Sequence, residues 1–250
     1  MSGRDDGSLV GIVVGTVDVG EAHRIVRLLT AERGRVAIMA RGARASSKRF
    51  AGLLEVGTSL EISFGRGRGG LPVLKAADRL GGPKRARRDL DRLALLAYGC
   101  ELCDALCAED EPAPKLHGLL AHWNELLEEE AQPGTSARLA LEAKALTFAG
   151  LAPALVRCAR CGGPLEDPTV YDALGGGGRH GRCGGGIPCR AEELAELEWL
   201  RRTPLRQVVA ERQGTDPGSL QWALARTVEA HIGRGLRSLG LLVDLAVPRG

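Results

Sequence analysis

Aromatic residues and long apolar runs are both scarce in this chain of 250 residues. Phe, Trp and Tyr together make up 3% of the sequence, and within residues 1–80 only Phe50 and Phe64 are aromatic. No apolar run approaches the roughly 20 residues that a membrane span requires, and the apolar stretch at residues 9–17 follows charged residues at 4–6. The sequence therefore predicts neither a spanning helix nor a secretory signal, and we expect a cytoplasmic protein.

Several catalytic signatures are also missing. The Gly-rich segment at residues 65–70 is not followed by Gly-Lys-Ser/Thr, which excludes a nucleotide P-loop. His117 and His122 are five positions apart with no Glu after the first, so the His-Glu-x-x-His arrangement of metalloproteases is absent. The zinc deaminase pattern, His-x-Glu with Pro-Cys-x-x-Cys, is missing as well. The sequence therefore offers none of these three catalytic signatures.

Charges of opposite sign are separated along the chain, although the net charge is only +3. Residues 33–49 hold six cations and no Asp or Glu, whereas residues 101–130 hold nine acids and one cation. A basic stretch confined to one segment indicates a binding face for a polyanion. Because few rings are available for bases to stack on, we expect contact mainly with phosphates, weak sequence preference and binding that salt weakens strongly.

The pattern of strands and helices predicts an α+β chain with two domains. Residues 1–80 show β-branched runs punctuated by glycine, which suit a small closed barrel of the OB type, although residues 21–33 could compete as a helix. Residues 81–250 show helical periodicity and are predicted to form an all-α domain. The expected strands span residues 9–17, 24–30, 35–41, 59–64 and 71–76, and the expected helices 86–111, 115–130, 136–148, 191–201, 204–212 and 216–239, the last with Asp216 as its N-cap.

A metal knuckle is predicted as an insertion in the helical domain, at about residues 156–190. Cys158 and Cys161 form a Cys-x-x-Cys pair, and Cys183 and Cys189 follow after a Gly-rich loop. Four thiolates of this kind are what one structural zinc ion requires. The second pair has five intervening residues, where two to four are usual, so His180 could replace Cys189 as the fourth ligand.

The order of these features resembles the RecO family of bacterial recombination mediators. The blocks that carry the resemblance are DVGEAHRIVRLLT at 18–30, RGRV at 33–36, ARGAR at 40–44, RGRGGLP at 66–72 and CARCG at 158–162. The likeness extends over nearly the whole chain. It implies a non-enzymatic protein that takes part in DNA repair and homologous recombination in the cytoplasm, associated with the nucleoid.

The resemblance also implies partners and contact residues. Such a protein binds single-stranded and double-stranded DNA, anneals complementary strands, and with RecR helps to load RecA onto single strands coated by SSB; RecF is a further candidate partner. By motif position, the DNA-binding face of the family maps here onto Arg24, Arg27, Arg41, Arg44, Lys48, Arg49, Arg66 and Arg68. Members that keep the zinc usually have fewer residues between the two cysteines of the second pair. This difference argues against Cys189 as a zinc ligand.

Three other interpretations stay open. A zinc-ribbon and barrel adaptor of transcription or translation would use the same basic face to bind RNA, and the relative affinity for RNA and DNA decides between the two. A metal-dependent hydrolase would need paired acids near the cysteines, which the sequence does not offer. Binding to a membrane surface lacks an adjoining amphipathic helix with bulky apolar anchors.

Overall fold

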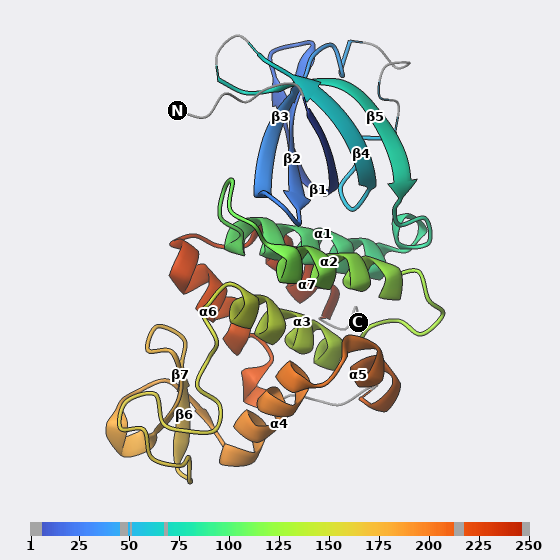
Figure 1. Cartoon of the computed structure of the whole chain (residues 1–250). Helices are drawn as coiled ribbons and strands as arrows, with labels where there is room; N and C mark the ends of the chain where they lie inside the picture. The colour runs from blue at the N-terminus through green and yellow to red at the C-terminus, as the bar shows by residue number, and fades with distance from the viewer. Residues whose placement is uncertain (1–6, 46–49, 51, 68–69, 213–217, 247–250) are drawn as a thin grey trace. The chain divides into compact units, whose positions relative to one another are not determined.

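A computed structural model describes residues 7–45, 50, 52–67, 70–212 and 218–246 of the chain (Figure 1). The chain divides into two compact units, residues 1–128 and 129–250. The first contains a β-barrel and two helices, and the second contains further helices and a small sheet. The compact units therefore part after the second helix, whereas the predicted domain boundary lies at the end of the barrel. Within the described residues, no helix is both long and apolar enough to cross a membrane.

Five strands close into a barrel in the order β1-β2-β3-β5-β4 (Figure 1), so the predicted OB-type fold is confirmed. Side chains that point inward from the strands build its core, which includes Val13, Val26, Ile38, Leu60 and Ile62. The segment that could compete as a helix forms instead the hairpin of β2 and β3. The strands are β1 Gly7–Val19, β2 His23–Thr30, β3 Gly34–Ala40, β4 Ser59–Gly65 and β5 Val73–Gly81.

Two helices complete the first unit: α1 (Leu90–Leu106) and α2 (Pro114–Leu126). The Asp89 carboxylate accepts the backbone N–H of Arg92 at 3.0 Å and caps α1, and Pro114 opens α2 at a position where its missing N–H costs nothing. A short 3-10 helix, η1 (Ala86–Arg88), joins the barrel to α1. The three cysteines of this region, Cys100, Cys103 and Cys107, are buried. Burial raises the pKa of the Cys100 thiol to about 12, so this thiol serves packing.

Helices of the second unit pack around α3 (Thr135–Phe148), most of whose residues are buried. The chain continues through α4 (Ala191–Arg202), α5 (Leu205–Glu211), the 3-10 helix η3 (Gly218–Leu220), α6 (Ala223–Ile232) and α7 (Arg237–Ala246). The prediction of one helix over 216–239 is wrong, because Gly233 adopts a left-handed conformation, with φ of +69°, that ends α6. Its proposed cap, Asp216, lies outside the described residues.

The predicted knuckle is a three-stranded antiparallel sheet with the order β7-β6-β8. Its strands are β6 (Thr169–Asp172), β7 (Gly177–His180) and β8 (Ile187–Cys189), and the 3-10 helix η2 (Gly181–Cys183) follows β7. Tyr171 of β6 is fully buried, and its hydroxyl lies 2.8 Å from Oγ1 of Thr227 on α6. This contact fixes the sheet to the helices of the same unit.

Candidate nucleic-acid interface and metal centre

The predicted DNA-binding residues that the structure describes lie on or next to three strands of the barrel. Arg24 and Arg27 belong to β2, Arg41 and Arg44 follow β3, and Arg66 follows β4. Arg41, Arg44 and Arg66 are exposed, and Arg24 and Arg27 are half-buried. The other three predicted contacts, Lys48, Arg49 and Arg68, lie outside the described residues.

Arg27 makes a contact inside the unit instead of facing a ligand. Its Nε and Nη2 groups each lie 2.9 Å from Oδ2 of Asp104, a residue of α1 whose side chain is only 7% exposed. Gly15 lies opposite Arg27 in β1, and a Cβ on Gly15 would approach the Arg27 guanidinium to 2.3 Å. A glycine is thus needed there for Arg27 to reach α1, so we assign Arg27 to the packing of α1 on the barrel.

Two arginines of the basic stretch at residues 33–49 are likewise paired with acids of the segment at residues 101–130. Arg33 forms an ion pair with Asp110, and Arg35 lies 3.0 Å from Oε1 of Glu109. Arg35 also donates to the backbone carbonyl of Asp104 at 3.1 Å. The two oppositely charged segments that the sequence separates are therefore in direct contact, and much of the basic charge at residues 33–35 is neutralised within the unit.

The remaining predicted contacts gather where β1 turns into β2 and where β3 ends. Arg24 lies opposite Asp18 on β1 and opposite Ala40 on β3, so Arg41 follows directly at the same end of the barrel. Asp18 accepts a hydrogen bond from Nε of Arg24 at 2.8 Å and lies 3.3 Å from Nε of Arg44. We define Arg24, Arg41 and Arg44 as the turn cluster. Arg66 lies at the end of β4, in a separate loop of the barrel.

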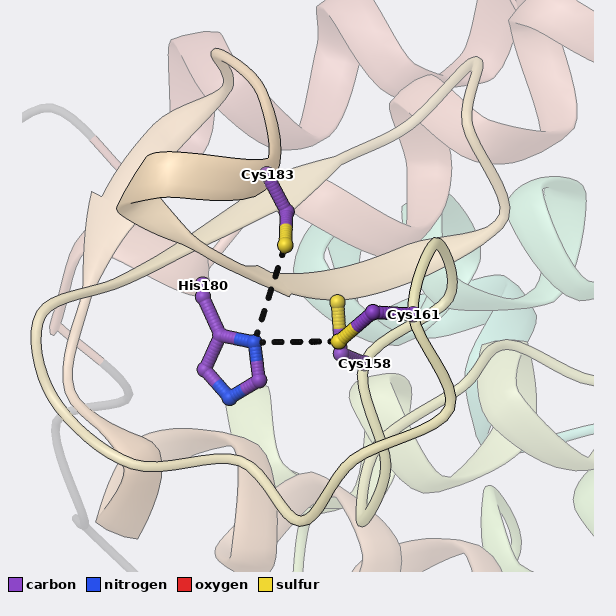
Figure 2. Close-up of side chains that lie close together, drawn as sticks. All are labelled: Cys158, Cys161, His180 and Cys183. Atoms are coloured by element: carbon purple, nitrogen blue, oxygen red, sulfur yellow. Dashed lines mark hydrogen bonds between the residues drawn. The ribbon is translucent and has the colours of Figure 1, made fainter.

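Four side chains of the knuckle lie close enough to hold one metal ion (Figure 2). The potential ligand atoms of Cys158, Cys161, His180 and Cys183 all lie within 4.8 Å of one another. Nδ1 of His180 is 3.5 Å from Sγ of Cys161 and 3.8 Å from Sγ of Cys183. Three thiolates and one imidazole are a known ligand set for structural zinc. Among the residues that the structure describes, these four side chains form the one cluster with enough potential ligands for a metal ion.

Backbone groups contact two of these four side chains, His180 and Cys158. Nε2 of His180 donates to the carbonyl of Pro164 at 2.8 Å, which leaves Nδ1 as the unprotonated nitrogen that faces the sulfurs in the neutral ring. The backbone N–H of Cys161 is the main group that lowers the pKa of the Cys158 thiol, to about 6. The neighbouring N–H groups of Arg160 and His180 act in the same direction. The turn thus favours the thiolate form that binds a metal.

Cys189, the predicted fourth ligand, is not part of this cluster. It lies at the end of β8, beside Thr169 of β6, and its Sγ is 3.7 Å from the Thr169 hydroxyl. His180 pairs with the same Thr169 from the other side, in β7. Because neighbouring strands are about 4.8 Å apart, the central strand separates Cys189 from His180 by two strand spacings. The structure therefore places His180, the alternative fourth ligand, in the cluster and leaves Cys189 outside it.

Comparison with known proteins extends over both halves of the chain. The family described as "Recombination protein O N terminal" matches residues 8–82, and "Recombination protein O C terminal" matches residues 87–240. The "DNA repair protein RecO" of Anaeromyxobacter dehalogenans (strain 2CP-C) is 38% identical over 245 residues, which cover 95% of this chain and 96% of that protein. This chain belongs to the RecO family.

Other RecO proteins show the same extent of similarity. The DNA repair protein RecO of Myxococcus xanthus (strain DK1622) is 34% identical and covers 94% of this chain, and that of Pelobacter propionicus is 39% identical and covers 95%. In each case 96% of the relative is covered. The N-terminal RecO match includes the whole of the turn cluster, and the C-terminal match includes all four residues of the metal cluster.

Sequence reasoning missed the acids that engage the arginines of this RecO barrel. Asp18 could have been found, because a hairpin with its turn near Gly20 places residues 18 and 24 opposite each other. The sequence gives no such signal for Asp104, because it is 77 positions from Arg27. The contact depends on which face of α1 carries Asp104 and on how that helix packs on the barrel. The same holds for the contacts that Glu109 and Asp110 make.

Proposed function

We propose that this chain is a non-catalytic mediator of DNA repair and homologous recombination. It binds single-stranded and double-stranded DNA through the barrel, anneals complementary strands, and with RecR helps to load RecA onto single strands coated by SSB. RecF is a further candidate partner. Membership of the RecO family, with matches on both sides of residue 85, is the observation that carries this proposal. The names of the curated relatives agree with it.

The barrel supports a mode of binding that depends on phosphates. Arg41, Arg44 and Arg66 are exposed cations, whereas the two aromatic residues of the barrel are engaged in packing: Phe64 is 6% exposed and Phe50 packs against the core. The buried Phe64 ring offers no platform for bases, and the Phe50 ring is partly buried against the core. Contacts to the backbone hold a strand without covering the base edges, which annealing needs to keep available for pairing.

We further propose that zinc occupies the cluster of Cys158, Cys161, His180 and Cys183 in a structural role. A bound zinc ion would supply a fixed tetrahedral link between the turn at residues 158–163 and the end of β7. The segment needs such a link because its sheet is small and rich in glycine. The thiolates and the imidazole would complete the four positions, so no coordination site would be left for a substrate.

The binding proposal is tested by competition between nucleic acids. Fluorescence anisotropy would compare single-stranded DNA, duplex DNA and single-stranded RNA of equal length over a series of salt concentrations. We expect both DNA forms to bind, with affinity that falls steeply with salt and depends little on sequence. A clear preference for RNA would instead support an adaptor of transcription or translation, and the absence of DNA binding would contradict the proposal.

The zinc proposal is tested by removing the metal. We expect one zinc ion per chain after purification, and a lower melting temperature of the second unit once a chelator has removed it. Adding zinc back should restore the melting temperature. A protein that contains no zinc, and whose melting curve is the same with and without the chelator, would contradict a structural site.

A further inference from the structure

The carboxylate of Asp18 contacts two of the arginines that the proposed function assigns to DNA. Its Oδ1 accepts from Nε of Arg24 at 2.8 Å, and its Oδ2 lies 3.3 Å from Nε of Arg44. Arg44 is held a second time, because its Nη1 donates to the carbonyl of Gly20 at 2.8 Å. One acid of β1 therefore engages cations from β2 and from the segment after β3.

These three side chains are all within reach of solvent. The exposed fractions are 45% for Asp18, 32% for Arg24 and 40% for Arg44. The backbone of Arg44 is fixed next to the hairpin, since its N–H donates to the carbonyl of Ala22 at 3.1 Å. A phosphate of a nucleic acid that approaches this end of the barrel can therefore meet the same guanidinium groups that now face a carboxylate.

Asp18 is present as an anion at neutral pH. The hydrogen bond from Arg24 is the largest influence that lowers the pKa of the Asp18 carboxyl below its ordinary value, and the charges of Arg24 and Arg44 add to it. A carboxylate and a phosphate accept the same guanidinium N–H donors. An ionised acid in this position reduces the net charge of the site and occupies donors that a phosphate would use.

We propose that Asp18 is an internal competitor of DNA phosphates for Arg24 and Arg44, and that it sets the affinity of the barrel below its attainable value. This inference rests on the proposed function. When a phosphate leaves, the carboxylate returns to the two guanidinium groups, so it favours release of the bound strand. A protein that anneals strands must release the duplex it has formed, and a competitor of this kind shortens the time that the product stays bound.

The test is the substitution Asp18→Asn, which removes the charge and keeps the size of the side chain. Removing one charge at about 7 Å from a phosphate in water changes affinity by roughly three-fold. We therefore expect Asp18→Asn to bind a duplex oligonucleotide at least about three-fold more tightly at low salt. We also expect the slope of log K against log salt to become steeper by up to about 0.9, which corresponds to one more phosphate neutralised.

Glu109→Gln is the matched control, because it also removes one acid of the first unit that is paired with an arginine. Glu109 lies 3.0 Å from Arg35, and its side chain is 71% exposed. Arg35 keeps its bond to the carbonyl of Asp104 in this variant, so it stays engaged. We expect a change in affinity well below that of Asp18→Asn. Equal tightening in both variants would show an effect of net charge alone and would overturn the inference.

A second background tests whether the effect passes through the two arginines. In a chain that carries Arg24→Gln and Arg44→Gln, adding Asp18→Asn should tighten DNA binding by less than it does in the parent chain, because it then removes only the direct repulsion between the carboxylate and the phosphate. Unchanged or weaker binding of the single variant Asp18→Asn, with the melting temperature of the parent chain, would overturn the inference alone. If the parent chain bound no DNA, the proposed function itself would fail, and the two failures are therefore distinguishable.

Discussion

Nε of Arg27 donates to Oδ2 of Asp104 at 2.9 Å, which joins the second strand of the barrel to the first helix. The Asp104 side chain is almost fully buried, so it depends on this cation for compensation of its charge. The arginines of the barrel, which look alike in the sequence, are therefore of two kinds. Arg27 holds the unit together, whereas Arg41, Arg44 and Arg66 face solvent.

Replacing Arg27 with Ala should therefore reduce stability. The substitution leaves a buried carboxylate without its partner, and we expect the free energy of unfolding to fall by about 2 to 3 kcal/mol. Denaturation by urea, followed by circular dichroism, measures the change. Arg41→Ala, at an exposed position of the same barrel, is the control and should change stability by less than about 0.5 kcal/mol. Equal stability of the two variants would show that the contact with Asp104 contributes nothing.

Replacing both Arg41 and Arg66 with Ala should weaken DNA binding without affecting the fold. Each exposed arginine that contacts a phosphate contributes about one unit to the slope of log K against log salt. We expect a shallower slope and weaker binding of every sequence to a similar degree. Arg202→Ala is the control, since this arginine on α4 is 73% exposed and carries the same charge. A similar loss of affinity in the control variant would argue against a binding face on the barrel.

Metal content should distinguish His180 from Cys189. We expect Cys189→Ser to keep its zinc, because Cys189 lies across the central strand from the cluster. His180→Ala should lose the metal, and His180→Cys should retain it with four sulfur ligands. Elemental analysis gives the stoichiometry, and substitution with cobalt reports the number of sulfur ligands from its absorption spectrum. Loss of zinc from Cys189→Ser, with retention in His180→Ala, would reverse this assignment.

Glu128 should make the stability of the first unit depend on pH. Burial opposes ionisation of this carboxyl, but the backbone N–H groups of Arg85 and Ala86, at 2.9 and 3.0 Å, outweigh it and lower its pKa below 4.5. A group with a lowered pKa in the folded state stabilises the fold above its unfolded pKa and loses this contribution as the pH falls through the folded value. The difference in unfolding free energy between the parent chain and Glu128→Gln should therefore be largest near neutral pH. It should shrink below about pH 4.5, and a difference that does not vary with pH would contradict this assignment.

The barrel could be predicted from the sequence because its signals are local. Alternation of apolar residues in β2 and β3, with the turn that ends at Gly34, is a property of adjacent positions. The same locality explains the competing helix over residues 21–33, which pairing with β1 and β3 overrides. The break between α6 and α7 was missed because a single glycine, Gly233, decides it, and glycine also occurs inside helices.

The candidate sites were predicted only in part, because spacing along a chain does not give the order of strands in space. Cys183 and Cys189 look like a pair in the sequence, yet β6 is inserted between β7 and β8 and moves Cys189 to the other edge of the sheet. The pairing of Arg27, Arg33 and Arg35 with acids more than 60 positions away likewise depends on how α1 packs on the barrel. Such contacts have no local signature.

We propose that this chain anneals DNA strands through phosphate contacts and acts on strands that SSB covers. The most direct test is the annealing of two complementary labelled oligonucleotides, with and without bound SSB, followed by fluorescence quenching over a series of salt concentrations. We expect annealing that persists on SSB-coated strands, falls steeply as salt rises, and is reduced in the Arg41 and Arg66 double variant. DNA binding without any acceleration of annealing, or annealing that SSB abolishes, would contradict it.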